Sequence, residues 1–159
     1  MSTYELTFVI NPIDDDTIDR LAENGIDWSQ MGRLQFAHVD QTADAPLSAI
    51  RAAHIMLETL GVQPRRLRLD LVSASEIAAR AGVSRPAVAK WTKQVTGDTA
   101  FPTEFDWSTT GPIWVWRDVN KWLQRTGKTG YDECCSLSLD DAEEGDRLIA
   151  DMRSSLVGR

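Results

Sequence analysis

The segment from Ser73 to Lys93, SASEIAARAGVSRPAVAKWTK, constrains the fold of this chain more than any other. It opens with a capping box, in which Ser73 is followed three residues later by a glutamate, and this pattern predicts the start of a helix. Gly82 then stands where a chain that leaves a helix needs a left-handed residue. Ser84 can cap a second helix, and Pro86 suits its first turn, where a missing N–H has little effect. The segment therefore predicts two short helices joined by a tight turn.

The apolar residues of this segment recur where two crossed helices face each other. They are Ile77, Ala81, Val83, Val88 and Trp91, and the small Ala78 lies where the helices approach most closely. The outer face of the second helix is left with Arg85, Ala89, Lys90 and Lys93. An α-helix fits the major groove of DNA, where Arg and Lys side chains donate to guanine O6 and N7. The segment therefore predicts a helix-turn-helix that binds double-stranded DNA.

The run IAARAGVSRPAVAKW resembles the helix-turn-helix of MerR-type and excisionase (AlpA-like) DNA-binding proteins. The likeness extends through Phe101-Pro102 and the sequence GPIWVWRDVNKWL from Gly111 to Leu123, and it covers about residues 71–125. In those families a small β-wing follows the helix-turn-helix, and a further helix opens with an Asp-Val pair, here Asp118-Val119. The resemblance implies a winged helix-turn-helix.

We expect two kinds of DNA contact from this arrangement. Arg85 and Lys90, on either side of Ala89 along the helix face, are the candidates for reading bases. The residues expected to contact phosphates are Ser84, Lys93, Arg117 and Lys121. The expected wing departs from the family pattern in two places. Pro112 stands where the wing often carries an arginine, and the insertion Thr96–Thr110 is longer and more acidic than a minimal wing.

The charge of the chain is unevenly distributed along the sequence. The formal net charge is −7, which by itself disfavours nucleic acid as a partner. Residues 1–64 hold 3 Lys/Arg against 10 Asp/Glu, residues 65–128 hold 11 against 6, and residues 129–159 hold 3 against 8. A basic middle between two acidic flanks indicates that a DNA contact is confined to the middle of the chain.

The first 70 residues alternate predicted strands and helices. The expected strands are Tyr4–Ile10, Arg33–Asp40 and Arg65–Leu71, and the expected helices begin near Asp14 and at Pro46. The order predicts a small β-α-β-α-β layer over residues 1–70, with helices covering the sheet, that serves dimerisation or sensing. His54 on the second helix is expected to be a partly buried or a rim residue and not a catalyst.

The last part of the chain, residues 129–159, is predicted as an acidic tail with a helix from Ser138 to Val157. Gly145 weakens the prediction of one continuous helix. The sequence leaves open whether this helix docks on the N-terminal part, pairs with a second copy of the chain or frays. The fold class is therefore α+β: an N-terminal β-α-β-α-β layer, a winged helix-turn-helix over residues 71–128, and an acidic C-terminal helix.

Tryptophan is concentrated in the predicted DNA-binding part, which holds five of the six in the chain. Such residues can stack on single-stranded bases, but a domain of about 55 residues needs large apolar side chains to form a core. We therefore expect structural positions: Trp91 and Trp122 fill the core, and Trp114 and Trp116 lie on opposite faces of a wing strand.

Several classes of protein are not indicated by the sequence. It contains no P-loop, nucleophile elbow or Gly-rich dinucleotide turn, and Cys134-Cys135 with two histidines gives no metal-ligand spacing. We therefore expect a protein that is not an enzyme and that needs no cofactor or metal. No apolar run is long enough to span a bilayer and the first residues lack a signal-peptide pattern, so we expect no membrane contact and a cytoplasmic location.

The function predicted from these features is sequence-specific binding of double-stranded DNA by a bacterial transcription regulator. One small helix-turn-helix reads few base pairs, so a homodimer on two half-sites is expected. The N-terminal part could respond to a small-molecule or protein effector that the sequence does not identify. Two alternatives stay open: an excisionase-like or architectural factor that bends DNA, and a protein-interaction adaptor that reuses the fold.

Overall fold

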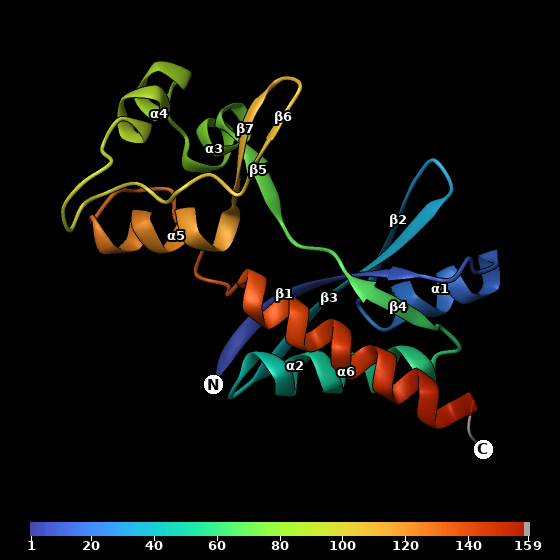
Figure 1. The fold of residues 1–159 in the computed structure, drawn as a ribbon. Coiled ribbons are helices and arrows are strands. Elements are labelled where there is room, and N and C mark those ends of the chain that lie inside the picture. Colours follow the sequence, from blue (N-terminus) through green and yellow to red (C-terminus); the bar gives the residue numbers. More distant parts are fainter. Residues whose placement is uncertain (158–159) are drawn as a thin grey trace. The chain divides into compact units, whose positions relative to one another are not determined.

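The computed structural model describes residues 1–157, which divide into two units (Figure 1). The first unit comprises Met1–Leu69 and the residues from Cys134 onward, and the second comprises Asp70–Glu133. Six helices and two antiparallel sheets lie within the described residues, so the chain is mixed α+β, as its sequence predicts.

The first unit is built on a four-stranded sheet in the order β2-β3-β1-β4. Every pair of neighbouring strands is antiparallel, and the elements follow one another as β-α-β-β-α-β. Their bounds are β1 (Ser2–Ile10), α1 (Asp15–Glu23), β2 (Asp27–Met31), β3 (Leu34–Ala43), α2 (Pro46–Thr59) and β4 (Pro64–Leu67). This order is that of the split β-α-β motif.

Two sequence predictions for this part of the chain are wrong. The strand β2 was not predicted, because DWSQM pairs only with β3 and lacks an alternating apolar pattern. The single strand expected over Arg65–Leu71 is two strands, β4 and β5 (Leu71–Ser73), in different sheets. Arg68 N donates to Thr7 O at 2.8 Å, whereas Asp70 O accepts from Trp116 N at 2.9 Å. The chain therefore changes partner sheets between Arg68 and Asp70.

The core of the first unit lies between one face of the sheet and the helices. Alternate residues of β1 contribute to it, as do α1, α2 and α6 (Leu139–Val157); the largest fully buried members are Leu6, Phe8, Leu21, Ile50, Leu57 and Ile149. His54 is also fully buried, not at the rim as expected, because α6 packs over α2.

The helix α6 packs against α2 and β4, which is the docked placement among those that the sequence left open. Gly145 allows this close approach: a Cβ there would collide with Cδ1 of Leu67 and lie 2.8 Å from Cδ1 of Ile50. The next residue, Asp146, accepts a hydrogen bond from the Leu67 backbone N–H at 2.7 Å. The glycine that weakened the helix prediction is thus the residue that lets the helix dock.

In the second unit, β5 is followed by two helices, two strands and a third helix. These are α3 (Ala74–Ala81), α4 (Arg85–Thr92), β6 (Asp106–Ser108), β7 (Gly111–Val115) and α5 (Trp116–Arg125), and the strands pair antiparallel in the order β5-β7-β6. Its core contains Val72, Ile77, Val88, Phe101, Trp114, Trp116, Val119, Trp122 and Leu123. Trp114 and Trp116 do not flank one strand, because Trp116 begins α5 and both indoles enter the same core.

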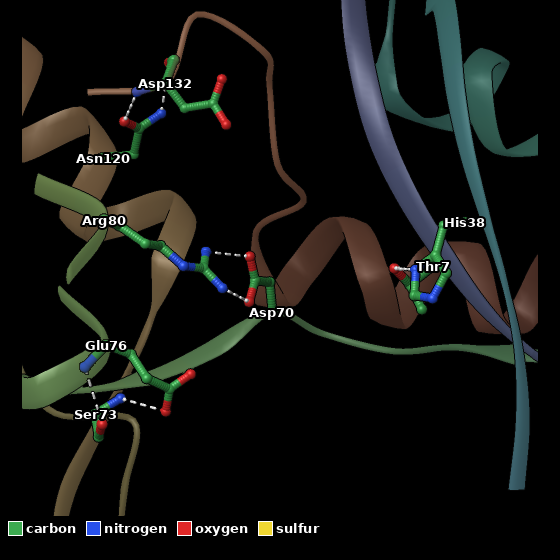
Figure 2. A network of polar contacts seen from close by, with 8 residues as sticks. All are labelled: Thr7, His38, Asp70, Ser73, Glu76, Arg80, Asn120 and Asp132. Carbon is green, nitrogen blue, oxygen red and sulfur yellow. Dashed lines mark hydrogen bonds and ion pairs between the residues drawn. The ribbon is translucent and has the colours of Figure 1, made fainter. Parts of the chain in front are cut away.

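The two irregular segments of the second unit are anchored to this core. In the first, Phe101 packs edge-on against Trp122, with ring centroids 4.9 Å apart. In the second, the side-chain amide of Asn120 donates to Asp132 O at 2.9 Å and accepts from Asp132 N at 2.7 Å (Figure 2). Gly130 lies against the backbone of Ala81 at the end of α3, where a Cβ would collide with it.

Candidate nucleic-acid interface

The turn between α3 and α4 has the local geometry that the sequence predicts. The Ser73 hydroxyl accepts from Glu76 N at 3.3 Å, and Ser73 N donates to the Glu76 carboxylate at 3.3 Å, which completes the capping box (Figure 2). Gly82 has φ +69°, in the left-handed region. Ser84 caps α4 by accepting a hydrogen bond from Ala87 N at 3.2 Å. The ends of both helices are thus fixed by their own sequence.

The helix α4 has one buried side and one exposed side. Val88 is buried, and Trp91 is half-buried with its ring centroid 5.3 Å from that of Trp122 on α5. The predicted contact residues on and around α4 are all exposed: Ser84, Arg85, Ala89, Lys90 and Lys93. At about 100° per residue, Ala89 and Lys93 point nearly opposite to Trp91. The exposed side is therefore held away from the core by the packing of the buried side.

The cations of α4 are not neutralised locally. Within the described residues, Arg85, Lys90 and Lys93 form no ion pair with a carboxylate. Residues 77–97 contain four Lys/Arg and no Asp/Glu. The positive potential of this stretch is therefore directed to solvent, where a phosphate backbone could reach it.

The two predicted contact residues on α5 are not brought together with α4. Arg117 is half-buried and its Nη1 lies 3.3 Å from Oδ1 of Asp118, while Lys121 is exposed one turn later. The indole of Trp122 on α5 contacts that of Trp91, so α5 packs against the buried side of α4 and not against its exposed side. Figure 1 shows α4 and the β6–β7 turn at one end of this unit and α5 at the other.

The basic block of the sequence is divided by the fold. Arg65, Arg66 and Arg68 belong to the first unit, and the second unit holds eight Lys/Arg against eight Asp/Glu. Arg80 is also engaged: its guanidinium donates to both carboxylate oxygens of Asp70, at 2.7 and 3.0 Å (Figure 2). The same guanidinium lies 4.8 Å from the ring centroid of Trp116. The net charge of the second unit is therefore zero, and its cations without a described carboxylate partner are divided between the α4 region and the segment from Lys121 to Lys128.

Two further residues were not singled out from the sequence. The Lys128 ammonium lies 5.5 Å from the ring centroid of Trp91 and 5.3 Å from that of Trp122. Trp107 on β6 is 67% exposed, and it is the one tryptophan of this part for which the sequence predicted no position. No local signal marks Lys128, since its partners are 37 and 6 residues away in the chain. For Trp107, the available signal of exposure was its place in a short hairpin with few apolar neighbours.

Both histidines belong to the first unit, outside this candidate interface, and have lowered pKa values. Burial lowers the pKa of His54, and Arg153 adds to that effect while Glu58 opposes it. Burial also lowers the pKa of His38, whose Nδ1 lies 3.0 Å from the Thr7 hydroxyl and whose Nε2 lies 2.8 Å from that of Ser29.

Across residues 1–157, none of the helices combines the length and the apolar character that crossing a bilayer requires. Comparison of the chain with protein-family models, with curated proteins and with solved structures gives no match.

Proposed function

We propose that this protein is a sequence-specific double-stranded DNA-binding protein that places α4 in the major groove, and that it acts as a bacterial transcription regulator. The observation that carries the proposal is the exposed face of α4. It presents three cations without a described carboxylate partner, and it is directed away from the core by the burial of Val88 and Trp91. Arg85 and Lys90 read base edges, and Ser84 and Lys93 contact phosphates.

The β6–β7 hairpin acts in this proposal as the wing of a winged helix-turn-helix. It lies at the same end of the unit as α4 in Figure 1. Its exposed Trp107 pairs in register with Pro112, which has no backbone N–H to donate. In this proposal the indole of Trp107 contacts the sugar-phosphate backbone, and it takes the place of the arginine that a wing often carries where Pro112 stands. The proposal does not depend on Arg117 and Lys121 of α5, whose expected phosphate contacts stay a prediction.

Affinity in this proposal comes from two copies of the chain. A single helix-turn-helix contacts few base pairs, and two copies bind half-sites about 34 Å apart. The first unit, with its own sheet and core, supplies the dimerisation or sensing element.

The test is selection of bound sequences from a random DNA pool by the full chain. The wild-type protein is expected to enrich one motif with two related half-sites, and Arg85→Ala/Lys90→Ala is expected to enrich none. Arg125→Ala is the matched control, because it removes an exposed cation from α5 at the other end of the unit. Equal enrichment by all three proteins, or no enrichment by the wild type at moderate salt, contradicts the proposal, since specific sites are typically bound at least ~10³-fold more tightly than other DNA.

The same material distinguishes the two alternatives. Two results together indicate an excisionase-like or architectural factor. The protein bends the selected DNA strongly, as measured by the mobility of circularly permuted fragments, and loss of the bound motif leaves transcript levels unchanged. Biological activity that survives Arg85→Ala/Lys90→Ala without DNA binding indicates a protein-interaction adaptor.

A further inference from the structure

Four arginines from three parts of the first unit line one hollow of about 440 Å³. Arg33 lies in the turn between β2 and β3, Arg65 and Arg66 lie on β4, and Arg153 lies on α6. These positions are up to 120 residues apart in the sequence, and only the fold brings them together. No Asp or Glu is among the residues that line the hollow.

The concentration of positive charge contrasts with the rest of the unit. The segments 1–69 and 134–159 contain nine Lys/Arg against sixteen Asp/Glu. None of the four arginines forms an ion pair within the part of the chain that the structure describes. Positive charges that lie close together without counter-charges repel one another, and an anion that binds among them reduces this electrostatic repulsion. The hollow is therefore suited to a ligand with more than one negative charge.

Three of the guanidinium groups are held in place by single hydrogen bonds. Arg65 Nη1 donates to Asn11 Oδ1 at 3.0 Å, Arg153 Nη1 donates to Arg65 O at 3.3 Å, and Arg66 Nη1 donates to Leu67 O at 3.3 Å. A guanidinium has five N–H donors in a planar fork, so each of these bonds leaves donors for a ligand. Arginine pairs with phosphate and carboxylate through two parallel hydrogen bonds, which makes such groups the fitting partners.

The hollow also has an apolar wall. Val9, Pro12 and Leu34 line it beside the arginines, and Leu34 is 48% exposed. Its volume lies within the range of about 300–1,000 Å³ that is usual for small-molecule sites, which combine apolar lining with a few polar groups. We propose that the first unit binds a small organic anion here, with a phosphate group among the arginines and an apolar body against Val9, Pro12 and Leu34.

A DNA backbone is the competing partner for such arginines. The concave shape and the apolar wall favour a small molecule, since phosphates of a duplex offer no apolar group to that wall. The inference is independent of the function proposed for α4, because it rests only on residues of the first unit.

The test is calorimetric titration of the full chain with ADP, pyrophosphate and adenosine. ADP carries phosphate groups and an aromatic base whose face can pack on the apolar wall. Pyrophosphate carries only the phosphate groups, and adenosine carries only the base with its sugar. ADP is expected to bind saturably with one site per chain, pyrophosphate more weakly, and adenosine not measurably up to about 5 mM.

Substitution variants locate the site. Arg33→Gln and Arg66→Gln are each expected to weaken ADP binding about tenfold or more, because each removes a charged hydrogen-bond donor. Both residues are exposed, so neither change disturbs the core. Arg51→Gln is the matched control: it removes an exposed arginine of α2 that does not line the hollow, and ADP affinity is expected to stay unchanged.

Three results would overturn the proposal. The first is a titration with ADP that does not saturate up to about 5 mM. The second is saturable binding that Arg33→Gln and Arg66→Gln do not weaken. The third is the absence of small-anion binding together with a loss of DNA affinity in the same two variants, which identifies the hollow as a contact for the DNA backbone. Failure of DNA binding by Arg85→Ala/Lys90→Ala bears only on α4 and leaves the anion site unaffected.

Discussion

The indole of Trp91 on α4 packs against the indole of Trp122 on α5, with ring centroids 5.3 Å apart and planes tilted by 52°. The Lys128 ammonium covers both rings, and Trp122 Nε1 donates to Thr99 O at 3.0 Å, so the contact is fixed from several sides. Because Ala89 and Lys93 lie nearly opposite to Trp91 around the helix, this contact determines which side of α4 is exposed. The stability of the second unit and the orientation of its candidate DNA-binding face therefore depend on the same pair.

Replacing Trp91 by Ala is expected to lower the free energy of unfolding of the second unit by about 2 kcal/mol, less than the ~3–5 kcal/mol of a fully buried tryptophan because Trp91 is half-buried. DNA affinity is expected to fall as well, since α4 loses its anchor. Urea unfolding followed by tryptophan fluorescence measures the change, because five of the six tryptophans lie in this unit. Trp91→Phe should lose less of both properties. Unchanged stability in Trp91→Ala would show that the contact is not needed.

Replacing Gly82 by Ala is expected to destabilise the second unit by roughly 1–2 kcal/mol, because its φ of +69° is unfavourable for a residue with a Cβ. The cause is conformational alone, since a Cβ at this position would meet no atom within 4 Å. Gly82→Asn should be milder, because asparagine tolerates the left-handed region better than alanine. Equal losses in the two variants, measured by thermal unfolding, would argue against this explanation.

In α6, replacing Gly145 by Ala brings two opposing effects. Alanine favours the helix by up to about 1 kcal/mol, whereas crowding against Leu67 and Ile50 costs typically ~1–3 kcal/mol. We expect a net loss of about 1–2 kcal/mol in the first unit, with faster amide hydrogen exchange in α6 and α2. The neighbouring exposed substitution Glu144→Ala should leave the unit's stability nearly unchanged. A more stable Gly145→Ala protein would show that α6 can move aside without loss.

The pH dependence of stability is expected to involve His54. Its Nδ1 lies 2.7 Å from Oε1 of Glu58, but the approach is not aligned as a hydrogen bond, so burial dominates and lowers the pKa. A lowered folded-state pKa keeps the imidazole neutral while the unfolded chain takes up a proton below pH ~6.5. The free energy of unfolding should therefore fall as the pH falls from about 6.5 toward the folded-state pKa, by at most ~1.4 kcal/mol per pH unit for each such histidine.

Chemical denaturation between pH 7.5 and 5 measures this dependence. His54→Leu should flatten the decrease without abolishing it, because the lowered pKa of His38 acts in the same direction. If His54→Leu keeps the full wild-type slope of unfolding free energy against pH, His54 is not the cause of the decrease.

Arg85 and Lys93 are expected to differ in how they affect DNA binding. Arg85→Ala should weaken binding to the selected motif by about 1–3 kcal/mol and relax the base preference at one position. Lys93→Ala should weaken binding to all sequences similarly and reduce the slope of log affinity against log salt by about 1. Titrations of selected and scrambled duplexes at several salt concentrations separate the two. Identical behaviour of the variants would contradict the division into base and phosphate contacts.

The sequence predicts the helix-turn segment well because its signals are local. The capping box of Ser73, the left-handed Gly82 and the cap of Ser84 each depend on residues three or four positions away. The alternation of apolar and exposed positions along α4 is likewise local, and the exposure of Arg85, Ala89 and Lys90 follows from it. The first strand and the first two helices were predictable for the same reason.

The features that the sequence missed depend on partners far along the chain. The edge strand β2 has no apolar pattern of its own and exists through its pairing with β3. The division of Arg65–Leu71 between two sheets depends on Thr7 and Trp116, which are distant in the chain. Gly145 weakens a helix when it is considered alone, and only the surfaces of Leu67 and Ile50 show why a side chain is excluded there.

By itself, the sequence determined the two capped helices and the exposed basic face of α4, because caps, turn glycines and helical periodicity act within a few residues. The tertiary structure alone decided how charge is distributed in space. It placed three arginines of the basic block in the first unit, paired Arg80 with Asp70, and gathered Arg33, Arg65, Arg66 and Arg153 around one hollow. Electrostatic interactions depend on distance in space rather than on separation along the chain, so a count of charges in the sequence could not reveal this arrangement.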